Sequence, residues 1–349
     1  MADLIPVRPE EVFDEAAVAA YLSRVLPGAD SPMAVTQFAG GKANLTYLLQ
    51  FAGGAEYILR RPPLGPVAPG AHDMAREHTV LSRLWRAFPQ APRSHLLCED
   101  ETVIGAPFVI MERRDGVVVR ETIPEVFGGG TDAVATASLS RVVIDTLTQF
   151  HAVDPAECDL GHLGRPEGFL ERQVRGWLGR WEQARHTDNP LADEVGSWLL
   201  DSLPASGEPT LLHNDWRLDN MAVAATDPSE CVAVYDWDMS TRGDPLCDLG
   251  TLLGSWHDSD EVDERTHSLM PVTASGWMSR ADAIALYGTR SGRDVSGMGW
   301  YVVFGTWKLG VVLEQIYIRY LRGQTSDTRF DSMGEGAARL FELAATRRP

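Results

Sequence analysis

The sequence predicts an α+β protein in which a small antiparallel sheet comes first and a mostly helical region follows. Two observations carry this prediction. Three strand-like segments follow one another without a helix between residues 35 and 60, and such short connections favour antiparallel pairing. From about residue 112 onward, apolar residues recur mainly at helical spacing. We therefore expect an N-terminal region of residues 1–111 and a C-terminal region of residues 112–349.

The elements of the first region are predicted from their periodicity and from the turn residues between them. They are a helix over 9–26, two strands within 35–51 around Gly40-Gly41, a strand over 57–60, a helix over 73–88 and two short strands within 103–111.

One acidic residue of the helix over 73–88 needs a partner. The inward stripe Leu81, Leu84 and Phe88 lands on Glu77 when it is extended back by one turn. Burying an unpaired carboxylate is costly, and Arg60 lies on the same strand face as Ile58. We predict an Arg60–Glu77 ion pair. The alternative, that Glu77 lies at the edge of the stripe and reaches water, stays open.

Further helices are predicted in the second region. They cover 138–151, 169–185, 191–203, 248–255, 284–288 after a capping box at Ser279–Asp282, and 300–321. No internal repeat is visible, which argues against a solenoid.

Composition and charge exclude several classes of partner. A net charge of −18 over 349 residues argues against nucleic acid or an anionic membrane as a general partner. The long apolar stretch 299–320 contains Lys308, Glu314 and Arg319, so it predicts a buried helix and not a membrane span. The scattered cysteines and the start of the chain, which lacks a signal-peptide profile, suggest reduced thiols and a cytoplasmic location.

The most informative motif is H-N-D-W-R-L-D-N at residues 213–220, followed by Asp236 in Y-D-W-D. An Asp and an Asn after a His, with a further Asp at a strand end, is the pattern by which kinases place a base and hold Mg²⁺ against phosphates. Asp215 would be the base, and Asn220 and Asp236 the metal ligands.

A predicted hairpin would bring the two metal ligands, Asn220 and Asp236, together. Met221–Ala224 and Cys231–Tyr235 are predicted strands around the turn residues 226–229. Folding the hairpin about Pro228 places Asn220 opposite Asp236, and directly opposed residues lie about 5 Å apart. An amide oxygen and a carboxylate at that distance can share one hard cation.

Other segments allow two interpretations each. The turn at Gly41, Lys42 and Asn44 is either a plain hairpin turn or a phosphate-binding loop, and its place in the chain favours the second. It is no Walker A loop, because Ala43 follows the lysine. Asp248 is either a helix N-cap or a brace beneath the catalytic loop.

Two further segments are less telling. His213 is predicted to be structural and bonded to the loop backbone. The acidic run from Asp258 to Glu264 is predicted to be a solvated loop, with a site for a cationic substrate as the alternative.

The residues of these motifs resemble the aminoglycoside phosphotransferase family. The resemblance rests on L-H-N-D-W-R-L-D-N at 212–220 and D-W-D-M-S-T-R-G-D-P-L-C-D-L at 236–249. The chain is most similar to a branch that is also found fused to acyl-CoA dehydrogenases. That closer match rests on R-R-P-P-L-G-P at 60–66, A-H-D-M-A-R-E at 71–77, I-G-A-P-F at 104–108 and M-E-R at 111–113.

This resemblance implies a two-lobed, protein-kinase-like fold with ATP or GTP and Mg²⁺ as cofactors. Adenine would bond the backbone around Glu112 and Arg113. Three residues depart from the family pattern. Arg60 stands where kinases usually carry Lys, Asn214 replaces the commoner Gly before the catalytic Asp, and Asp238 follows where Glu is frequent.

The predicted function is transfer of a nucleotide γ-phosphate to a hydroxyl of a small molecule. The acceptor would be either an aminoglycoside-like cation or a hydroxyacyl-type metabolite. Two alternatives stay open, a non-catalytic nucleotide-binding module and a metal-dependent hydrolase. A protein acceptor is disfavoured because no D-F-G…A-P-E signature is present.

Overall fold

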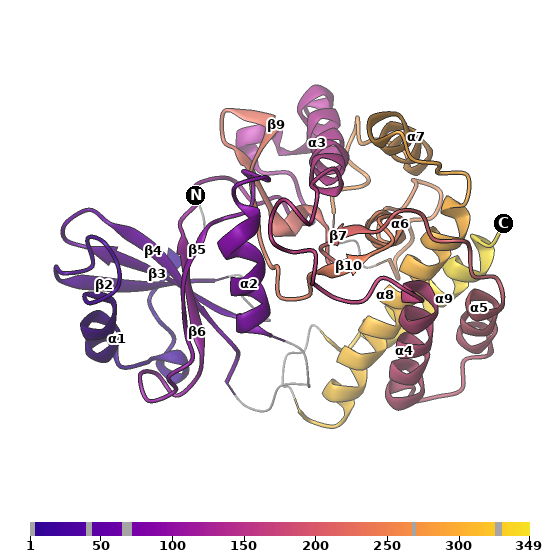
Figure 1. Cartoon of the computed structure of the whole chain (residues 1–349). Helices are drawn as coiled ribbons and strands as arrows, with labels where there is room; N and C mark the ends of the chain where they lie inside the picture. The colour runs from indigo at the N-terminus through magenta and orange to yellow at the C-terminus, as the bar shows by residue number, and fades with distance from the viewer. Residues whose placement is uncertain (1–3, 40–43, 65–71, 267–269, 325–329) are drawn as a thin grey trace. The chain divides into compact units, whose positions relative to one another are not determined.

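The computed structural model describes residues 4–39, 44–64, 72–266, 270–324 and 330–349 (Figure 1). The chain forms two compact units. The first comprises Met1–Val118, Pro155–His162 and Asn220–Ser240, and the second comprises the remaining segments. Each unit is described by itself below.

The first unit is built on an antiparallel sheet, as predicted. Its strand order is β1-β2-β3-β4-β6-β5, and every neighbouring pair in it is antiparallel. The strands are β1 (Leu4–Ile5), β2 (Met33–Phe38), β3 (Leu45–Phe51), β4 (Glu56–Arg61), β5 (Ser94–Cys98) and β6 (Phe108–Glu112). The predicted strand pair within 103–111 is corrected: only β6 forms there, because residues 101–106 make turns, and its partner β5 lies earlier in the chain.

The two faces of this sheet carry different side chains. One face packs against α1 (Glu15–Leu22) through a cluster that includes Val18, Tyr47 and Leu49. Alternation along β4 then directs Arg60 to the opposite face, where it meets α2 (Met74–Leu84). The sheet therefore presents one buried cation toward α2.

A separate hairpin of the first unit carries both predicted metal ligands. β8 (Met221–Ala224) pairs with β9 (Asp227–Val234). At the base of the hairpin Met221 pairs with Val234, and the Tyr235 N–H donates to the Asn220 carbonyl at 2.8 Å. Asn220 is therefore opposite Tyr235 and not Asp236. The predicted register was wrong by one residue, because the tight turn lies at 225–226 and the register shifts along the hairpin.

The second unit is mainly helical (Figure 1). Its helices are α3 (Ala133–His151), α4 (Phe169–Ala184), α5 (Pro190–Asp201), α6 (Leu246–Gly254), α7 (Arg280–Ser291), α8 (Met298–Leu321) and α9 (Met333–Thr346). A two-stranded ladder joins β7 (Thr210–Leu212) to β10 (Thr241–Gly243). The predicted helices are all found, with shifted ends, whereas α9, β7 and β10 were not predicted.

Helices α6 and α8 cross with their backbones in contact. A Cβ on Gly254 would lie 2.5 Å from the Gly305 carbonyl carbon, and a Cβ on Gly305 would lie 2.0 Å from the Gly250 oxygen. Any side chain at these positions would push the helices apart. The crossing fixes α6, which carries Asp248, against the longest described helix.

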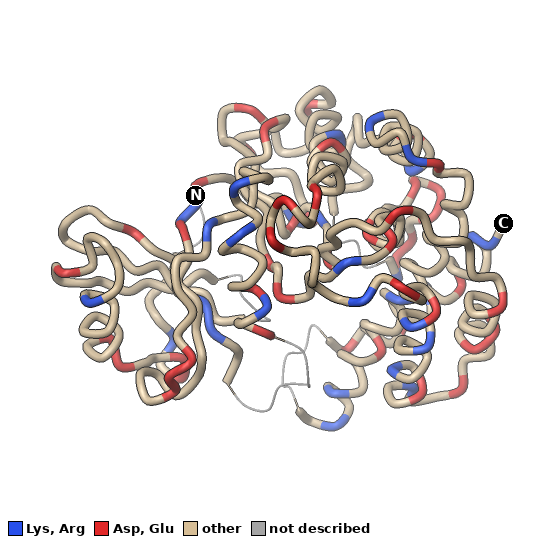
Figure 2. The backbone as a smooth tube through the Cα atoms, in the orientation of Figure 1, with Lys and Arg blue, Asp and Glu red and all other residues tan. Residues whose placement is uncertain are grey.

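Charged residues of both signs are interspersed along the chain in both units (Figure 2). Among the described residues, no helix is long and apolar enough to cross a membrane.

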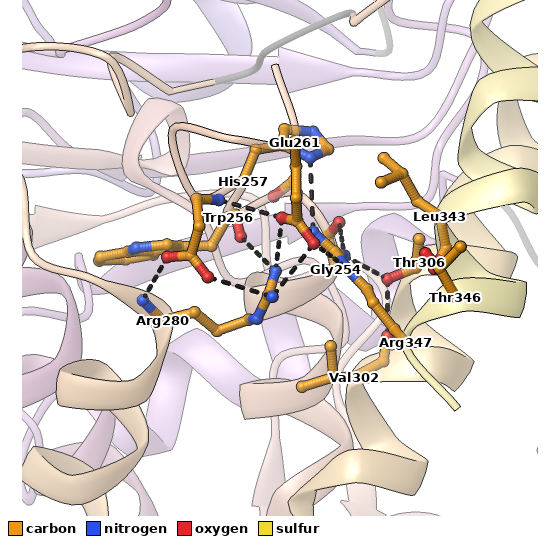
Figure 3. A network of polar contacts seen from close by, with 12 residues as sticks. Gly254, Trp256, His257, Glu261, Arg280, Val302, Thr306, Leu343, Thr346 and Arg347 are labelled. Atoms are coloured by element: carbon orange, nitrogen blue, oxygen red, sulfur yellow. Dashed lines mark hydrogen bonds and ion pairs between the residues drawn. The ribbon is translucent and has the colours of Figure 1, made fainter. Parts of the chain in front are cut away.

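The acidic run after α6 is part of a partly buried ion-pair network (Figure 3). Arg347 donates to both carboxylate oxygens of Glu261, at 2.9 and 2.6 Å, and also to Thr306 Oγ1 at 2.6 Å. Arg280 donates to Glu261 at 2.8 Å. His257 lies beside Arg347, with 3.5 Å between Nδ1 and Nη2. The network joins the segment after α6 to α7, α8 and the end of α9.

This network predicts that the protein loses stability in mild acid. Burial, followed by the charge of Arg347, lowers the pKa of His257 to about 4. The unfolded chain binds that proton near pH 6.5, so stability falls as the pH drops from about 6.5 toward 4. For His257 alone we expect a loss of roughly 2 kcal/mol between about pH 7.5 and pH 5. Glu261, whose pKa is held down by Arg347 and Arg280 against the effect of burial, adds a loss below about pH 4.5.

Urea unfolding at the two pH values measures this effect. His257→Asn should reduce the loss of unfolding free energy between about pH 7.5 and pH 5 by roughly 2 kcal/mol. Other buried histidines, such as His151, continue to contribute in both proteins. An equal pH dependence in the variant and the wild type would show that His257 is not the source.

Candidate active site

The loop that carries Asp215 follows β7 in the second unit. Asn214 takes a left-handed backbone conformation with φ of 68°, which Asn tolerates better than most residues other than Gly. This explains how Asn can stand where the resembling family commonly has Gly. The Asp215 N–H donates to His213 Nδ1 at 3.3 Å, and His213 is fully buried. The prediction that His213 is structural is confirmed.

Asp248 braces this loop from beneath. One of its carboxylate oxygens accepts the N–H of His213 at 2.6 Å, and the other accepts the N–H of Asn214 at 2.7 Å. Pro245 occupies the N-cap of α6, so the bracing interpretation is confirmed and the N-cap alternative is wrong. Burial alone would raise the pKa of Asp248, but the hydrogen bonds from His151 and the loop backbone lower it overall. The brace is therefore an ionised carboxylate.

A second layer holds Asp248 in turn. His151 Nε2 lies 3.4 Å from the Asp248 carboxylate, and its Nδ1 lies 2.8 Å from the Tyr287 hydroxyl. The Thr210 hydroxyl donates to the His151 carbonyl at 3.0 Å. Burial lowers the pKa of His151. This chain of contacts ties the loop to α3 and α7.

Two cations flank Asp215 that the sequence argument missed. Lys308 of α8 donates to the Asn214 carbonyl at 3.1 Å, and Arg217 Nε lies 3.5 Å from Asp215 and 3.0 Å from Asp219. Lys308 is the only charged residue between Met298 and Leu313 of α8, and a lysine in such a stretch needs an acceptor. That was the signal that could have identified it.

The predicted Arg60–Glu77 pair is present in the first unit, with 3.3 Å between Nη1 and Oε1. The other terminal nitrogen of Arg60 donates to Asp236. Glu77 is almost fully buried, at 1% exposure. Burial raises the pKa of Glu77 despite the nearby guanidinium. The charges of Glu77 and Asp236 raise the pKa of Arg60 against the effect of burial. Arg60 is therefore protonated and positively charged.

Asp238 belongs to a second cluster in the same unit. Asn44 Nδ2 donates to Asp238 Oδ2 at 3.2 Å, and Asn44 Oδ1 lies 2.9 Å from His72 Nδ1. These contacts join Asn44, directly before β3, and His72, two residues before α2, to the loop after β9. Gly41 and Lys42 lie outside the described residues.

The predicted metal ligands lie at the open end of the β8–β9 hairpin, Asn220 directly before β8 and Asp236 two residues after β9. Asn220 is buried at 8% exposure, and Asp236 has a left-handed backbone with φ of 67°. Among the described residues, no group of three or more His, Cys, Asp or Glu side chains could hold a metal. An amide oxygen and a carboxylate are hard donors of the kind that Mg²⁺ accepts, with nucleotide oxygens and water completing its shell. The donors present therefore fit Mg²⁺.

The predicted base-binding segment lies at the end of β6. The Glu112 N–H already donates to the Arg93 carbonyl at 2.8 Å, and the Arg113 side chain is paired with Glu56 and Asp115. A base contact would fall to the remaining backbone groups of 112 and 113. It stays a prediction.

The acidic run forms a loop, but only Asp260 and Glu264 among its acidic residues are exposed, so the predicted solvated loop is confirmed only in part. Asp258 lies 3.1 Å from Arg280, and Asp263 lies 2.9 Å from Arg339. Together with the Glu261 network, these pairs engage Asp258, Glu261 and Asp263 within the protein. They therefore give no support to a site for a cationic substrate.

The sequence matches the phosphotransferase enzyme family over residues 34–268. The chain belongs to this family. The predicted resemblance is thereby confirmed, and the enzyme class is that of the small-molecule phosphotransferases.

Relatives and solved structures place the chain within the family. It is 32% identical to acyl-CoA dehydrogenase family member 11 from Gallus gallus over 92% of this chain and 41% of that protein, so it spans less than half of that relative. A candidate aminoglycoside phosphotransferase from Ralstonia eutropha superposes with a TM-score of 0.81 at 27% identity, covering 96% of this chain and 98% of the other.

A choline kinase from Cryptosporidium parvum superposes with a TM-score of 0.66 at 11% identity, over 96% of this chain and 95% of the other. At that identity the likeness concerns the fold alone. The predicted α+β, kinase-like fold is confirmed by these structures.

Proposed function

We propose that this phosphotransferase is Mg²⁺-dependent and moves the γ-phosphate of ATP or GTP to a hydroxyl of a small molecule. The observation that carries the proposal is the β8–β9 hairpin. A buried Asn220 directly precedes β8, and Asp236 follows β9 by two residues. Together they supply two hard oxygen donors in a family that transfers phosphate.

The metal would be held by Asn220 and Asp236, and it would neutralise charge on the β- and γ-phosphates when bound. Arg60 would contact phosphate through its planar fork, and Glu77 would orient it. Gly41, Lys42 and Asn44 are proposed to line the phosphates, and the backbone at Glu112 and Arg113 to meet the base.

Asp215 is proposed as the general base that accepts the proton of the acceptor hydroxyl. Its loop is held by rigid contacts: Asp248 fixes the backbone before it, and Lys308 holds the Asn214 carbonyl. Such fixed positioning is the main contribution that a protein makes to phosphoryl transfer.

The acceptor is proposed to be a hydroxylated small molecule, either an aminoglycoside-like cation or a hydroxyacyl-type metabolite. Because carboxylates of the acidic run pair with arginines of the same chain, the run gives no support to a cationic acceptor. A panel of acceptors from both classes tests the choice.

The proposal predicts that phosphate leaves the nucleotide much faster when an acceptor is present. Purified protein, Mg²⁺ and γ-labelled ATP or GTP are mixed with each acceptor, and labelled acceptor and free phosphate are measured in a single turnover. EDTA should abolish transfer, and added Mg²⁺ should restore it. Phosphate release at one rate with or without acceptor would indicate a hydrolase, and nucleotide binding without any turnover would indicate a binding module.

A further inference from the structure

Arg60 makes two ion pairs at once. Its Nη1 lies 3.3 Å from Glu77 Oε1, and its Nη2 donates to Asp236 Oδ1. Arg60 is buried at 8% exposure and Glu77 at 1%. The Arg60 guanidinium therefore contacts two carboxylates, that of Glu77 in α2 and that of Asp236, which is proposed to hold the metal. Two separated nitrogens are needed for this bridge, which a lysine ammonium cannot supply in the same way.

The adjacent arginine of β4, Arg61, has other partners than Arg60. Arg61 points to the other face of the sheet, where it donates to the Glu11 carbonyl at 2.7 Å and to the Tyr47 hydroxyl at 3.1 Å. Arg61 is equally buried, at 2% exposure, but its contacts lie on the α1 side. The strand thus provides two buried arginines, and Arg60 is the one that contacts Asp236.

We propose that Arg60 is the resident cation of Asp236 in the nucleotide-free protein and that it competes with the divalent metal for this carboxylate. This inference rests on the proposed function, which makes Asp236 a metal ligand. Two cations near one carboxylate repel each other strongly at low effective dielectric. Metal alone therefore binds weakly. When the nucleotide arrives, its phosphates offer Arg60 new acceptors, and the carboxylate becomes available to the metal that the nucleotide brings.

The consequence is an order of binding that is set by one side chain. The metal enters with the nucleotide and not before it, and Glu77 keeps Arg60 in reach of the phosphates throughout. Arg60 is in this respect a positioning residue that couples the metal to its nucleotide.

Binding of Mn²⁺ as a paramagnetic probe, measured by electron spin resonance without nucleotide, tests the inference. Arg60→Met should tighten Mn²⁺ binding about tenfold or more relative to the wild type, which damage to the fold would not produce. Arg60→Lys, which keeps a charge for Glu77, should tighten it less. Arg61→Met is the matched control for loss of a buried arginine from the same strand and should leave Mn²⁺ affinity unchanged. In the presence of ATP, the advantage of Arg60→Met should shrink or reverse.

The outcomes distinguish a failure of the Arg60 competition from a failure of the proposed function. If Arg60→Met and Arg60→Lys both bind Mn²⁺ within about twofold of the wild type, a range that corresponds to well under 1.4 kcal/mol, the competition is refuted and the proposed function stands. If Arg61→Met tightens binding as much as Arg60→Met, the competition is also refuted. If the wild type fails to bind Mn²⁺ even with ATP, the proposed function itself is wrong.

Discussion

Replacing Asp215 by Asn is expected to lower kcat for phosphate transfer by about 10²- to 10⁴-fold, the range typical of removing a general base. Asn keeps the size of the side chain and can keep the contact with Arg217, which lies 3.5 Å from the carboxylate. It cannot accept the proton of an acceptor hydroxyl. The loop backbone should stay in place, because its contacts with Asp248 do not involve the Asp215 side chain.

The measurement pairs single-turnover transfer with nucleotide binding by calorimetry. Binding of MgATP should change by less than about threefold, since the loss concerns the proton transfer and not the phosphates. Asp201→Asn, an exposed residue at the end of α5, serves as a control for loss of a carboxylate. Undiminished transfer by Asp215→Asn would remove Asp215 from the mechanism, whatever the rest of the site does.

Local patterns predicted the elements that carry the site. The Arg60–Glu77 pair followed from one helix stripe and the cost of burying a lone carboxylate, and the structure has it. The bracing role of Asp248 was one of two interpretations of its place at a helix start, and the structure selects it. Such predictions succeed because they depend on periodicity and on charge, which a single sequence displays.

The register of the β8–β9 hairpin could not be predicted from local patterns. A symmetric fold about Pro228 paired Asn220 with Asp236, but the turn at 225–226 and the register shifts between Ala222 and Ala224 place Asn220 opposite Tyr235 instead. A bulge inserts a residue on one strand, and no rule of alternation shows where it will fall. A slip of one residue changes which side chains of the two strands share a face, so the role of Asn220 and Asp236 as metal ligands stays a prediction.

Long-range contacts were the other limit. The acidic run from Asp258 to Glu264 suggested a solvated loop, because charge runs usually are. Its partners Arg339 and Arg347 lie in or just after α9, a helix that was not predicted. Likewise, Lys308 reaches the Asn214 carbonyl from a distant helix. The sequence displays each charge, but pairing depends on helix packing that no local pattern encodes.

Asp248→Ala is expected to be the most damaging single change to the stability of the second unit. The substitution removes the acceptor of two backbone N–H groups and a contact of His151. Each buried group that loses its acceptor costs about 1–3 kcal/mol, so we expect a loss of about 3–5 kcal/mol in the free energy of unfolding, measured in urea.

Two milder variants, Asp248→Asn and Tyr287→Phe, test whether the Asp248 brace also contributes to catalysis. Asp248→Asn keeps one oxygen for one N–H and should cost roughly half as much, while Tyr287→Phe removes only the outer hydrogen bond to His151 and should cost about 1 kcal/mol. Because Asn214 holds a left-handed conformation, a loop that loses the brace can relax toward commoner backbone angles and carry Asp215 with it. Transfer by Asp248→Asn, assayed well below its melting temperature, should then fall more than its stability alone explains. Full activity of folded Asp248→Asn would instead make the brace purely structural.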